Sequence, residues 1–491
     1  MKFKALIALT VSLASLAYAS DGTAQSRSQQ RTRSISQSTA AQAAQQHPQI
    51  VAEFGGEEGG ARGTYVRNVG SRVTAQTNIA GGANAFRVTT LNSPVMNAFA
   101  VPGGYLYITR QLLGLMNDEA ELASVLGHEA GHITARHSAA RRRTGLLSQL
   151  GALVVGVVTG SGQLAQIAGQ AGQVWALSYS RSQELEADDL GVRYMTAAGY
   201  DPAAAPTMLA SLGAWSDLEA RFRGSDSDQR STPSWARSHP LSADRVRRSN
   251  QRVQQTGRSG QGIRNREQHL AAINGMYFDD DPAQGMVEGR EFVHPDLRLA
   301  FTVPQGFGIQ NGTRAVAIVG QSGQAQFSTG QFNGDLRTYV GQVFQALGGQ
   351  QQIPYSQPQN TTINGIPAAY STARVQTQQG VVDVTVVAYQ FDSNHAYHFA
   401  MMTRGGTGIG AFEPMVQSLR RLTPQQAAAV RPRVLQIHTV RSGDTVQSLA
   451  SRMAYTTHQA ERFRALNGLT ANSTLRAGDR VKIVVYGTRR S

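Results

Sequence analysis

A histidine–glutamate pattern has the residue types of a catalytic zinc site. His128 and His132 are four residues apart, and Glu129 directly follows the first of them. Four residues span just over one turn of an α-helix, so both imidazoles would project from the same face and could bind one metal ion. Neutral imidazoles suit zinc, and a neighbouring carboxylate can act as a general base. The pattern therefore predicts metal-assisted hydrolysis.

The surrounding residues predict the helix that this pattern requires. Asn117 is a suitable N-cap, and acidic residues follow it, where the helix dipole favours negative charge. Apolar residues then recur at helical spacing as far as Ile133. We therefore expect a helix over residues 117–138 that buries one face.

A second pattern offers a third ligand, which catalytic zinc sites usually have. Glu184 and Asp188 are four residues apart on a predicted helix, so they share a face. Glu184 could bind the metal while Asp188 accepts a hydrogen bond from a ligand imidazole and fixes its tautomer. His137 lies on the opposite side of its helix from His128, so we expect it to be a structural hydrogen-bonding residue. Gln183 and Glu186 are expected to be surface residues. The predicted metal ligands are therefore His128, His132 and Glu184.

The N-terminal residues have the plan of a secretory signal peptide. Two lysines precede an apolar run over residues 5–16, and Ala17, Tyr18 and Ala19 follow. The apolar run is too short to span a bilayer. We expect a signal peptide over residues 1–19 and a periplasmic protein, with a disordered, polar spacer over residues 20–50.

The cysteine content and net charge of the chain limit the kinds of stabilisation and of binding partner that we expect. The 491 residues include no cysteine, so an exported chain must be stabilised by ordinary cores rather than disulfides. The formal net charge is +14, almost all of it from arginine. This charge could attract anionic lipids or cell-wall polymers, or could simply form a solvated surface. No nucleic-acid-binding motif accompanies it, so nucleic acid is not an expected partner.

Four sequence blocks resemble the CaaX-prenyl protease and HtpX family of zinc metallopeptidases, in its exported BepA-like branch. The resemblance covers about residues 60–250, and the blocks read NAFAVPGGYLYIT, ELASVLGHEAGHITARH, SRSQELEADDLG and SHPLSADR. The resemblance implies a mainly α gluzincin-type metallopeptidase domain with a small sheet over residues 51–268. It implies one zinc ion per chain, held by His128, His132 and Glu184, with Glu129 as the catalytic carboxylate.

The same resemblance gives the residues around the ligands their expected roles. Asp188 matches the aspartate of the family's E-x-x-x-D element. His239 and Arg245 match its H-P-x-x-x-x-R element near the site, as regulatory or oxyanion-stabilising groups. We expect residues 212–236 to form a mobile loop ahead of His239. His239 could bind the metal and act as a latch. The apolar residues 146–171 predict a buried hairpin of helices or an element that dips into a membrane without spanning it.

Two further units are predicted after the peptidase domain. Residues 285–424 alternate like strands and predict an α+β accessory domain. Residues 425–433 are expected to be a linker. Residues 434–487 resemble a LysM module, with the order strand, two helices, strand, and such modules typically bind N-acetylglucosamine-containing glycans such as peptidoglycan. Because every predicted ligand precedes residue 246, we expect this tail to be dispensable for cleavage of a soluble peptide.

The sequence therefore predicts a multidomain, exported zinc metalloendopeptidase in cell-envelope protein quality control. Its expected substrates are polypeptides such as misfolded envelope proteins, and residues 437–486 would contact peptidoglycan. Two alternatives stay open. The protein could be an amidase or endopeptidase that acts on peptidoglycan, or a non-catalytic scaffold that binds peptidoglycan and envelope proteins, although the intact Glu129 argues against a scaffold.

Overall fold

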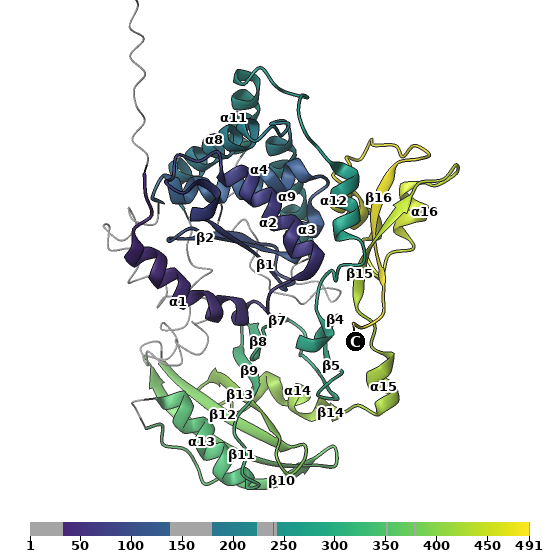
Figure 1. Ribbon diagram of the computed structural model, residues 1–491. Helices are drawn as coiled ribbons and strands as arrows, with labels where there is room; N and C mark the ends of the chain where they lie inside the picture. Colours follow the sequence, from purple (N-terminus) through teal and green to yellow (C-terminus); the bar gives the residue numbers. More distant parts are fainter. Residues whose placement is uncertain are drawn as a thin grey trace, which may run out of the picture.

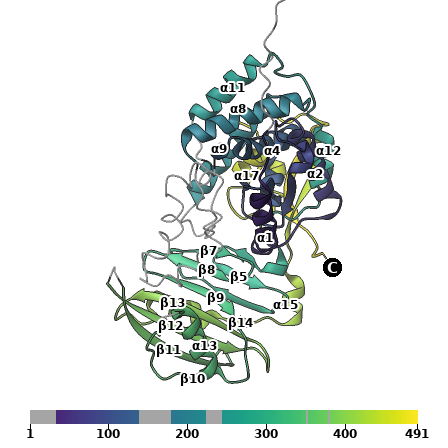
Figure 2. The same ribbon diagram turned by 60° about the vertical axis from the view of Figure 1, so that its left-hand side comes forward.

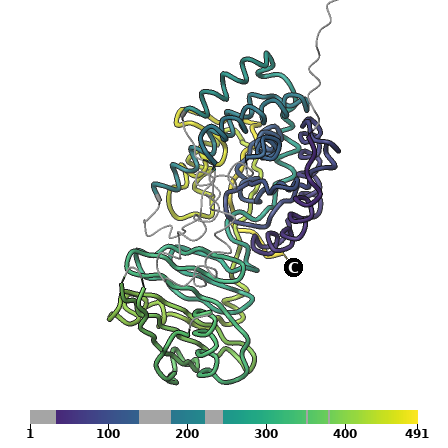
Figure 3. The backbone as a smooth tube through the Cα atoms, turned by 90° about the vertical axis from the view of Figure 1, so that its left-hand side faces the viewer, coloured from purple at the N-terminus to yellow at the C-terminus, as the bar shows by residue number. Residues whose placement is uncertain are grey.

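The chain folds into two lobes joined side by side (Figures 1 and 2). The first lobe contains the N-terminal helices and a small sheet, and the C-terminal segment returns to it (Figure 3). The second lobe contains two sheets and helix α13 (Leu336–Gly348). The computed structural model describes residues 33–137, 179–222, 239, 243–349, 352–377 and 380–490. The predicted signal peptide and the predicted hairpin at residues 146–171 lie outside these ranges.

Helix α4 (Glu119–Thr134) is the buried centre of the first lobe, and only its Ile133 is not buried. Its N-cap is Asp118 rather than the predicted Asn117, because the Asp118 carboxylate accepts a hydrogen bond from the backbone N–H of Glu121 at 2.9 Å. Glu121 in turn accepts from the backbone N–H of Asn117 at 2.7 Å. These two bonds satisfy amide groups that a helix start leaves without partners, and the acidic first turn complements the helix dipole.

Glycines bring α4 close to the next long helix. A methyl group on Gly131 would lie 3.1 Å from the Ala187 carbonyl oxygen, and one on Gly127 would lie 3.1 Å from that of Gly191. Larger residues would push the helices apart, so these glycines allow the histidine pattern to lie against the acidic pattern. The helices packed on α4 are α2 (Gly60–Thr74), α8 (Arg181–Ala197) and α9 (Ala204–Phe222). The shorter helices of this lobe are η1 (Gly82–Ala85), α3 (Arg110–Leu115), α11 (Ala243–Gln255) and α12 (Arg266–Ile273).

A three-stranded sheet packs against α4. Its order is β1 (Arg87–Leu91), β3 (Tyr105–Thr109), β2 (Ala98–Val101), with β1 parallel and β2 antiparallel to β3. Leu106 and Ile108 join the core around α4, whereas Phe99 and Tyr107 pack on the other face. Alternation in the sequence predicts strands over residues 88–91 and 105–109, which correspond to β1 and β3. It missed β2, which is only four residues long.

Two predictions of disorder are wrong in part. Helix α1 (Gln37–Glu53) covers the outer face of the sheet and includes much of the predicted spacer, because Ile50 and Phe54 pack on Phe99 and Tyr107. These apolar contacts are too widely spaced to stand out in a polar segment. Helix α9 includes residues 212–222 of the predicted mobile loop, because Leu212, Trp215 and Leu218 are buried. Residues 20–32 and 223–236 lie outside the described ranges.

The second lobe has the predicted mixture of helix and strand. One core joins its two sheets, with Phe301 of the smaller sheet 5.0 Å from Phe399 of the larger one between ring centroids. Helix α13 packs on the opposite face of the larger sheet. The larger antiparallel sheet has the order β10 (Gln359–Ile363), β11 (Ile366–Thr377), β12 (Gly380–Gln390), β13 (Ala396–Arg404), β9 (Gly323–Thr329), β8 (Val316–Gly320), β7 (Phe307–Asn311). The smaller has the order β14 (Arg420–Arg421), β6 (Leu299–Thr302), β5 (Glu291–His294), β4 (Met286–Glu288).

The sequence over residues 410–422 predicts a single helix, but the helix in this segment ends at Ser418. The structure has η3 (Gly410–Phe412) and α14 (Glu413–Ser418), after which β14 pairs with β6. Another short helix, η2 (Pro282–Gln284), leads into β4. At residues 420–421, the pairing of β14 with β6 therefore outweighs helix propensity.

The C-terminal segment has the element order that its sequence predicts. Strands β15 (Arg433–Thr439) and β16 (Arg480–Tyr486) pair antiparallel around α16 (Val446–Ala450) and α17 (Gln459–Asn467). The preceding linker prediction is wrong for residues 425–429, which belong to α15 (Pro424–Ala429) with Thr423 as its N-cap.

This C-terminal segment is not a separate appendage. Its buried Leu435, Phe463 and Leu466 belong to the same apolar core as the residues around α4. The backbone of β15 also bonds to the chain after α12, where Gly275 N–H donates to Leu435 O at 2.7 Å and Leu435 N–H donates to Met276 O at 2.9 Å. The position of the predicted ligands before residue 246 is therefore not a sufficient reason to expect a dispensable tail, because the tail shares the core that surrounds α4. Among the described helices, none is both long and apolar enough to span a bilayer.

Candidate metal centre

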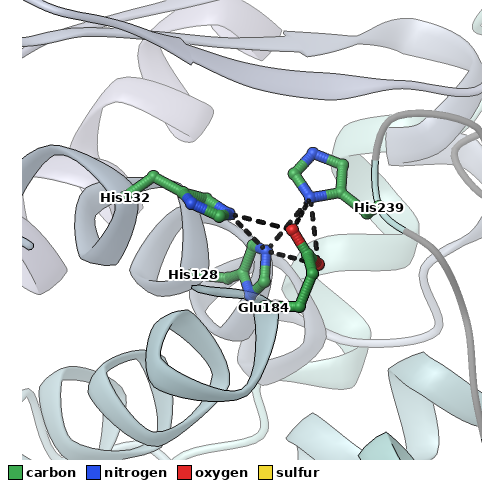
Figure 4. Close-up of side chains that lie close together, drawn as sticks. All are labelled: His128, His132, Glu184 and His239. Carbon is green, nitrogen blue, oxygen red and sulfur yellow. Dashed lines mark hydrogen bonds and ion pairs between the residues drawn. The ribbon is translucent and has the colours of Figure 1, made fainter. Parts of the chain in front are cut away.

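Four side chains meet in one buried cluster (Figure 4). His128 and His132 come from α4, Glu184 from α8, and His239 from the chain before α11. The Nε2 atoms of His128 and His132 are 3.0 Å apart. Glu184 places one carboxylate oxygen 3.6 Å from Nε2 of His128 and the other 3.5 Å from Nε2 of His132. One possible ligand atom from each of the four residues lies within 4.8 Å of the others.

The outer nitrogen of His128 is held by a carboxylate. His128 Nδ1–H donates a hydrogen bond to Oδ1 of Asp188 at 2.9 Å, which leaves Nε2 directed at Glu184 and His132. Burial alone would raise the pKa of Asp188, but hydrogen bonds from Arg245 and His128 lower it. This is the arrangement that fixes a ligand imidazole in its metal-binding tautomer.

Arg245 supports the acidic side of the cluster. Its Nε and Nη2 each donate to Asp188 at 2.8 Å, and Nη1 lies 2.8 Å from a carboxylate oxygen of Glu184. Burial by itself would raise the pKa of Glu184, but His239, His128 and Arg245 together lower it. The guanidinium of Arg245 therefore contacts both carboxylates beside His128, those of Asp188 and Glu184.

Glu129 lies beside the ligand set and is fully buried. Its carboxylate is 3.5 Å from Nε2 of His239. Burial raises the pKa of Glu129 despite the opposing effect of His239 and His128. Within the described part of the chain, neither of its carboxylate oxygens has a hydrogen-bond partner. A buried carboxylate without partners is costly, and such a group suits a site that binds a metal ion and a reacting water.

The other side of His132 has contacts that the sequence did not reveal. The Tyr179 ring stacks on the His132 ring at 3.6 Å between centroids and 18° between planes. Nδ1 of His132 lies 2.8 Å from Nδ1 of His137, consistent with the predicted structural role of His137. Burial lowers the pKa of His137. Tyr179 lacks a recognisable sequence signal, because it is a single aromatic residue two positions before a helix.

The donor set fits zinc. Imidazole nitrogens and a carboxylate oxygen are its ordinary ligands, and catalytic sites keep three protein ligands and one exchangeable position. His128, His132 and Glu184 would supply the three, and His239 lies within the same group of possible ligand atoms. The predicted residues are therefore brought together in space, while their roles stay predictions.

Comparisons with known proteins agree with this geometry. Residues 61–253 match Peptidase family M48, and residues 438–484 match the LysM domain. The chain is 34% identical over 130 residues to the mitochondrial metalloendopeptidase OMA1 of Arabidopsis thaliana, across 26% of each protein. It is 31% identical over 163 residues to the beta-barrel assembly-enhancing protease of Escherichia coli, across 30% of this chain and 32% of that one.

A third relative matches over a longer share of its length. This is the OMA1 metalloendopeptidase of Schizosaccharomyces pombe, which is 31% identical over 186 residues, 38% of this chain and 51% of that protein. The chain thus spans about a quarter to a half of the length of these curated relatives.

Proposed function

We propose that this protein is a zinc-dependent metalloendopeptidase, because residues 61–253 match Peptidase family M48 and residues 438–484 match the LysM domain. The observation that carries the proposal is the convergence of His128, His132 and Glu184 beside the buried carboxylate of Glu129. The family match and the relatives' names support the same reaction class.

The residues divide the chemistry between them. His128, His132 and Glu184 would hold the zinc ion, which when bound polarises the scissile carbonyl and lowers the pKa of water. Glu129 takes a proton from the attacking water and gives it to the amine that leaves. The upward shift of the Glu129 pKa suits this exchange, because a general base is most effective when its pKa lies near the working pH. Asp188 and Arg245 keep His128 and Glu184 in place.

An extended polypeptide could bind along the small sheet. Strand β2 pairs with β3 on one side only, and α4 packs against β2. An edge strand can accept a further strand through main-chain hydrogen bonds, which recognise peptides with little dependence on side chains. We infer that polypeptides are the substrates.

Digestion of casein and of purified peptidoglycan in parallel tests this function. We expect cleavage of casein only, its loss in the presence of a zinc chelator, and its recovery after zinc is restored. Release of peptidoglycan fragments instead would favour the cell-wall hydrolase, and no hydrolysis of either substrate would favour the scaffold.

His239 is proposed to hold the enzyme latent. Its Nδ1 lies 3.1 Å from Glu184 and 3.3 Å from Nε2 of His128, so it could serve as a fourth ligand that displaces water. We expect His239→Ala to raise the basal rate of cleavage of a short peptide and to weaken zinc retention slightly against a chelator. Lower activity with unchanged zinc affinity would mean that His239 assists the transition state and is not a latch.

We also propose a role in the cell envelope. The signal-like N-terminus, the LysM match and the similarity to a beta-barrel assembly-enhancing protease support a periplasmic enzyme that degrades misfolded envelope proteins near peptidoglycan. In the LysM domain a cavity of about 410 Å³ is lined by His438, Arg441 and Arg452, among others. Basic side chains suit the carboxylates of peptidoglycan stem peptides.

The cavity gives a test of peptidoglycan binding. The double variant Arg441→Glu and Arg452→Glu should reduce co-sedimentation with insoluble peptidoglycan, because it replaces two exposed cations with anions. Cleavage of a soluble peptide should be unaffected, since neither side chain touches the metal cluster. Unchanged co-sedimentation would show that this cavity does not bind peptidoglycan.

A further inference from the structure

A chain of two hydrogen bonds leads from the metal cluster to the protein surface. The Nδ1 atoms of His132 and His137 are 2.8 Å apart, and Nε2 of His137 lies 3.2 Å from a carboxylate oxygen of Glu186. His137 is buried, whereas the side chain of Glu186 is 60% exposed. The two histidines lie five residues apart at the end of α4, and Glu186 lies on α8 two residues after Glu184.

The positions of the protons follow from the chemistry of the partners. A carboxylate accepts hydrogen bonds, so Nε2 of His137 is the donor to Glu186. A neutral imidazole carries one N–H, so Nδ1 of His137 has none and must accept. The proton between the two Nδ1 atoms therefore belongs to His132. The Nε2 of His132 then carries a lone pair rather than a proton, and this is the atom that faces Glu184 and His128.

We propose that His137 and Glu186 are positioning residues that hold His132 in its zinc-binding tautomer and so increase the affinity for zinc. The inference rests on the proposed function, because it concerns the same metal centre. In this arrangement each of the two histidines of α4 has its own orienting partner, which the sequence does not suggest. His128 is oriented by the buried Asp188 and Arg245, and His132 is oriented by a histidine whose own partner is exposed to solvent.

The stacking of Tyr179 on His132 complements this bond. The ring contact limits tilting of the imidazole, but stacking on a ring face involves neither ring nitrogen as a hydrogen-bond donor. Only a hydrogen bond at Nδ1 selects between the tautomers, and in the described part of the chain His137 supplies the acceptor there. The bond to His137 is therefore the feature whose removal should alter the metal affinity.

The experiment measures the zinc dissociation constant of each full-length variant by competition with a chelator. His137→Leu removes the acceptor and should weaken zinc binding by about 10–100-fold, as is typical when the partner of a ligand histidine is lost. His137→Gln keeps an acceptor oxygen and should recover most of the affinity. Glu186→Ala should weaken binding by a smaller factor, because water can replace an exposed carboxylate.

A matched control separates this effect from charge. Asp189→Ala makes the same change in net charge on the same helix, but Asp189 pairs with Arg248 at the surface, at 2.7 Å. Its zinc affinity should equal that of the wild type. The melting temperature of each metal-free variant reports folding independently, and His137→Gln and His137→Leu should differ far less in this value than in zinc affinity.

Three outcomes would overturn the inference. One is wild-type zinc affinity in His137→Leu, and another is a His137→Gln variant as weak as the leucine variant, since the hydrogen bond would then not be the cause. The third is an equal loss of affinity in Asp189→Ala and Glu186→Ala, which would indicate a general effect of charge. Absence of zinc binding by the wild type would be a different result, because it would overturn the proposed function itself.

Discussion

Replacement of Glu129 by glutamine should reduce the rate of casein cleavage by about 10²–10⁴-fold, the usual contribution of a general base. Glutamine has nearly the same shape as glutamate but cannot take up a proton at neutral pH. The ligands His128, His132 and Glu184 are untouched, so zinc content should not change. The site is buried, and the substitution removes a carboxylate that burial disfavours, so the variant should be at least as stable as the wild type.

The measurements are initial rates of casein cleavage, zinc content and the melting temperature. Glu461→Gln, an identical substitution at an exposed position of α17, is the control and should retain full activity. Cleavage by Glu129→Gln at close to the wild-type rate would show that Glu129 is not the base.

Replacement of Lys482 by methionine should lower the free energy of unfolding by about 3–5 kcal/mol, as expected when one partner of a buried charged network is removed. Lys482 is fully buried in β16, and its ammonium donates hydrogen bonds to the carbonyl oxygens of Gly114, Leu115 and Met116 at 2.9, 2.7 and 2.7 Å. Burial lowers the pKa of Lys482, and the nearby Glu121 opposes that shift.

These contacts connect the C-terminal segment that matches the LysM domain to the start of α4. The three carbonyls lie at the end of α3 and in the short connection to α4, and a cation near the end of a helix satisfies carbonyls that have no partner within the helix. Methionine would fill the space but remove the ammonium donor from all three carbonyls, of which Met116 O also lies 3.1 Å from Nε2 of His269. The start of α4, and with it the position of the metal ligands, should become less well fixed.

Deletion of residues 434–491 should have the larger effect and leave no cooperatively folded peptidase domain. The deletion removes Lys482 together with the apolar side chains that the LysM domain contributes to the shared core, such as Phe463 and Leu466. Urea unfolding and cleavage of a short peptide measure the two consequences. Arg476→Met, which removes a positive charge from an exposed side chain of the same domain, should change stability by no more than about 0.5 kcal/mol.

A truncated chain that cleaves the short peptide at the wild-type rate would contradict this account. The LysM domain would then be separable, as the sequence alone suggested. An insoluble or inactive truncated chain, together with a destabilised Lys482→Met variant, would show that this domain is a structural part of the peptidase.

The helical spacing of two short patterns predicted most of the metal centre. His128 and His132 on one helix, and Glu184 and Asp188 on another, are related by local geometry that a sequence displays directly. The close packing of the two helices was less visible, although Gly127 and Gly131 permit it. Contacts of His132 with Tyr179 depend on tertiary packing, which residue spacing does not report.

The position of the LysM domain could not be predicted from its own sequence. Its framework residues define a fold, whereas its attachment depends on complementary surfaces far away in the chain. One signal was present, because Lys482 is the only lysine after Lys4 in a chain that otherwise uses arginine. It lies in a strand among apolar residues, where a charged side chain needs a specific partner.

The most direct test of the account is an anomalous difference map at the zinc absorption edge from crystals of the wild-type protein grown with zinc. We predict one strong peak per chain, bound by Nε2 of His128, Nε2 of His132 and the carboxylate of Glu184, with Glu129 beside it and not among the ligands. A map with no peak at this cluster, or a peak bound by a different set of residues, would contradict the proposed metal centre.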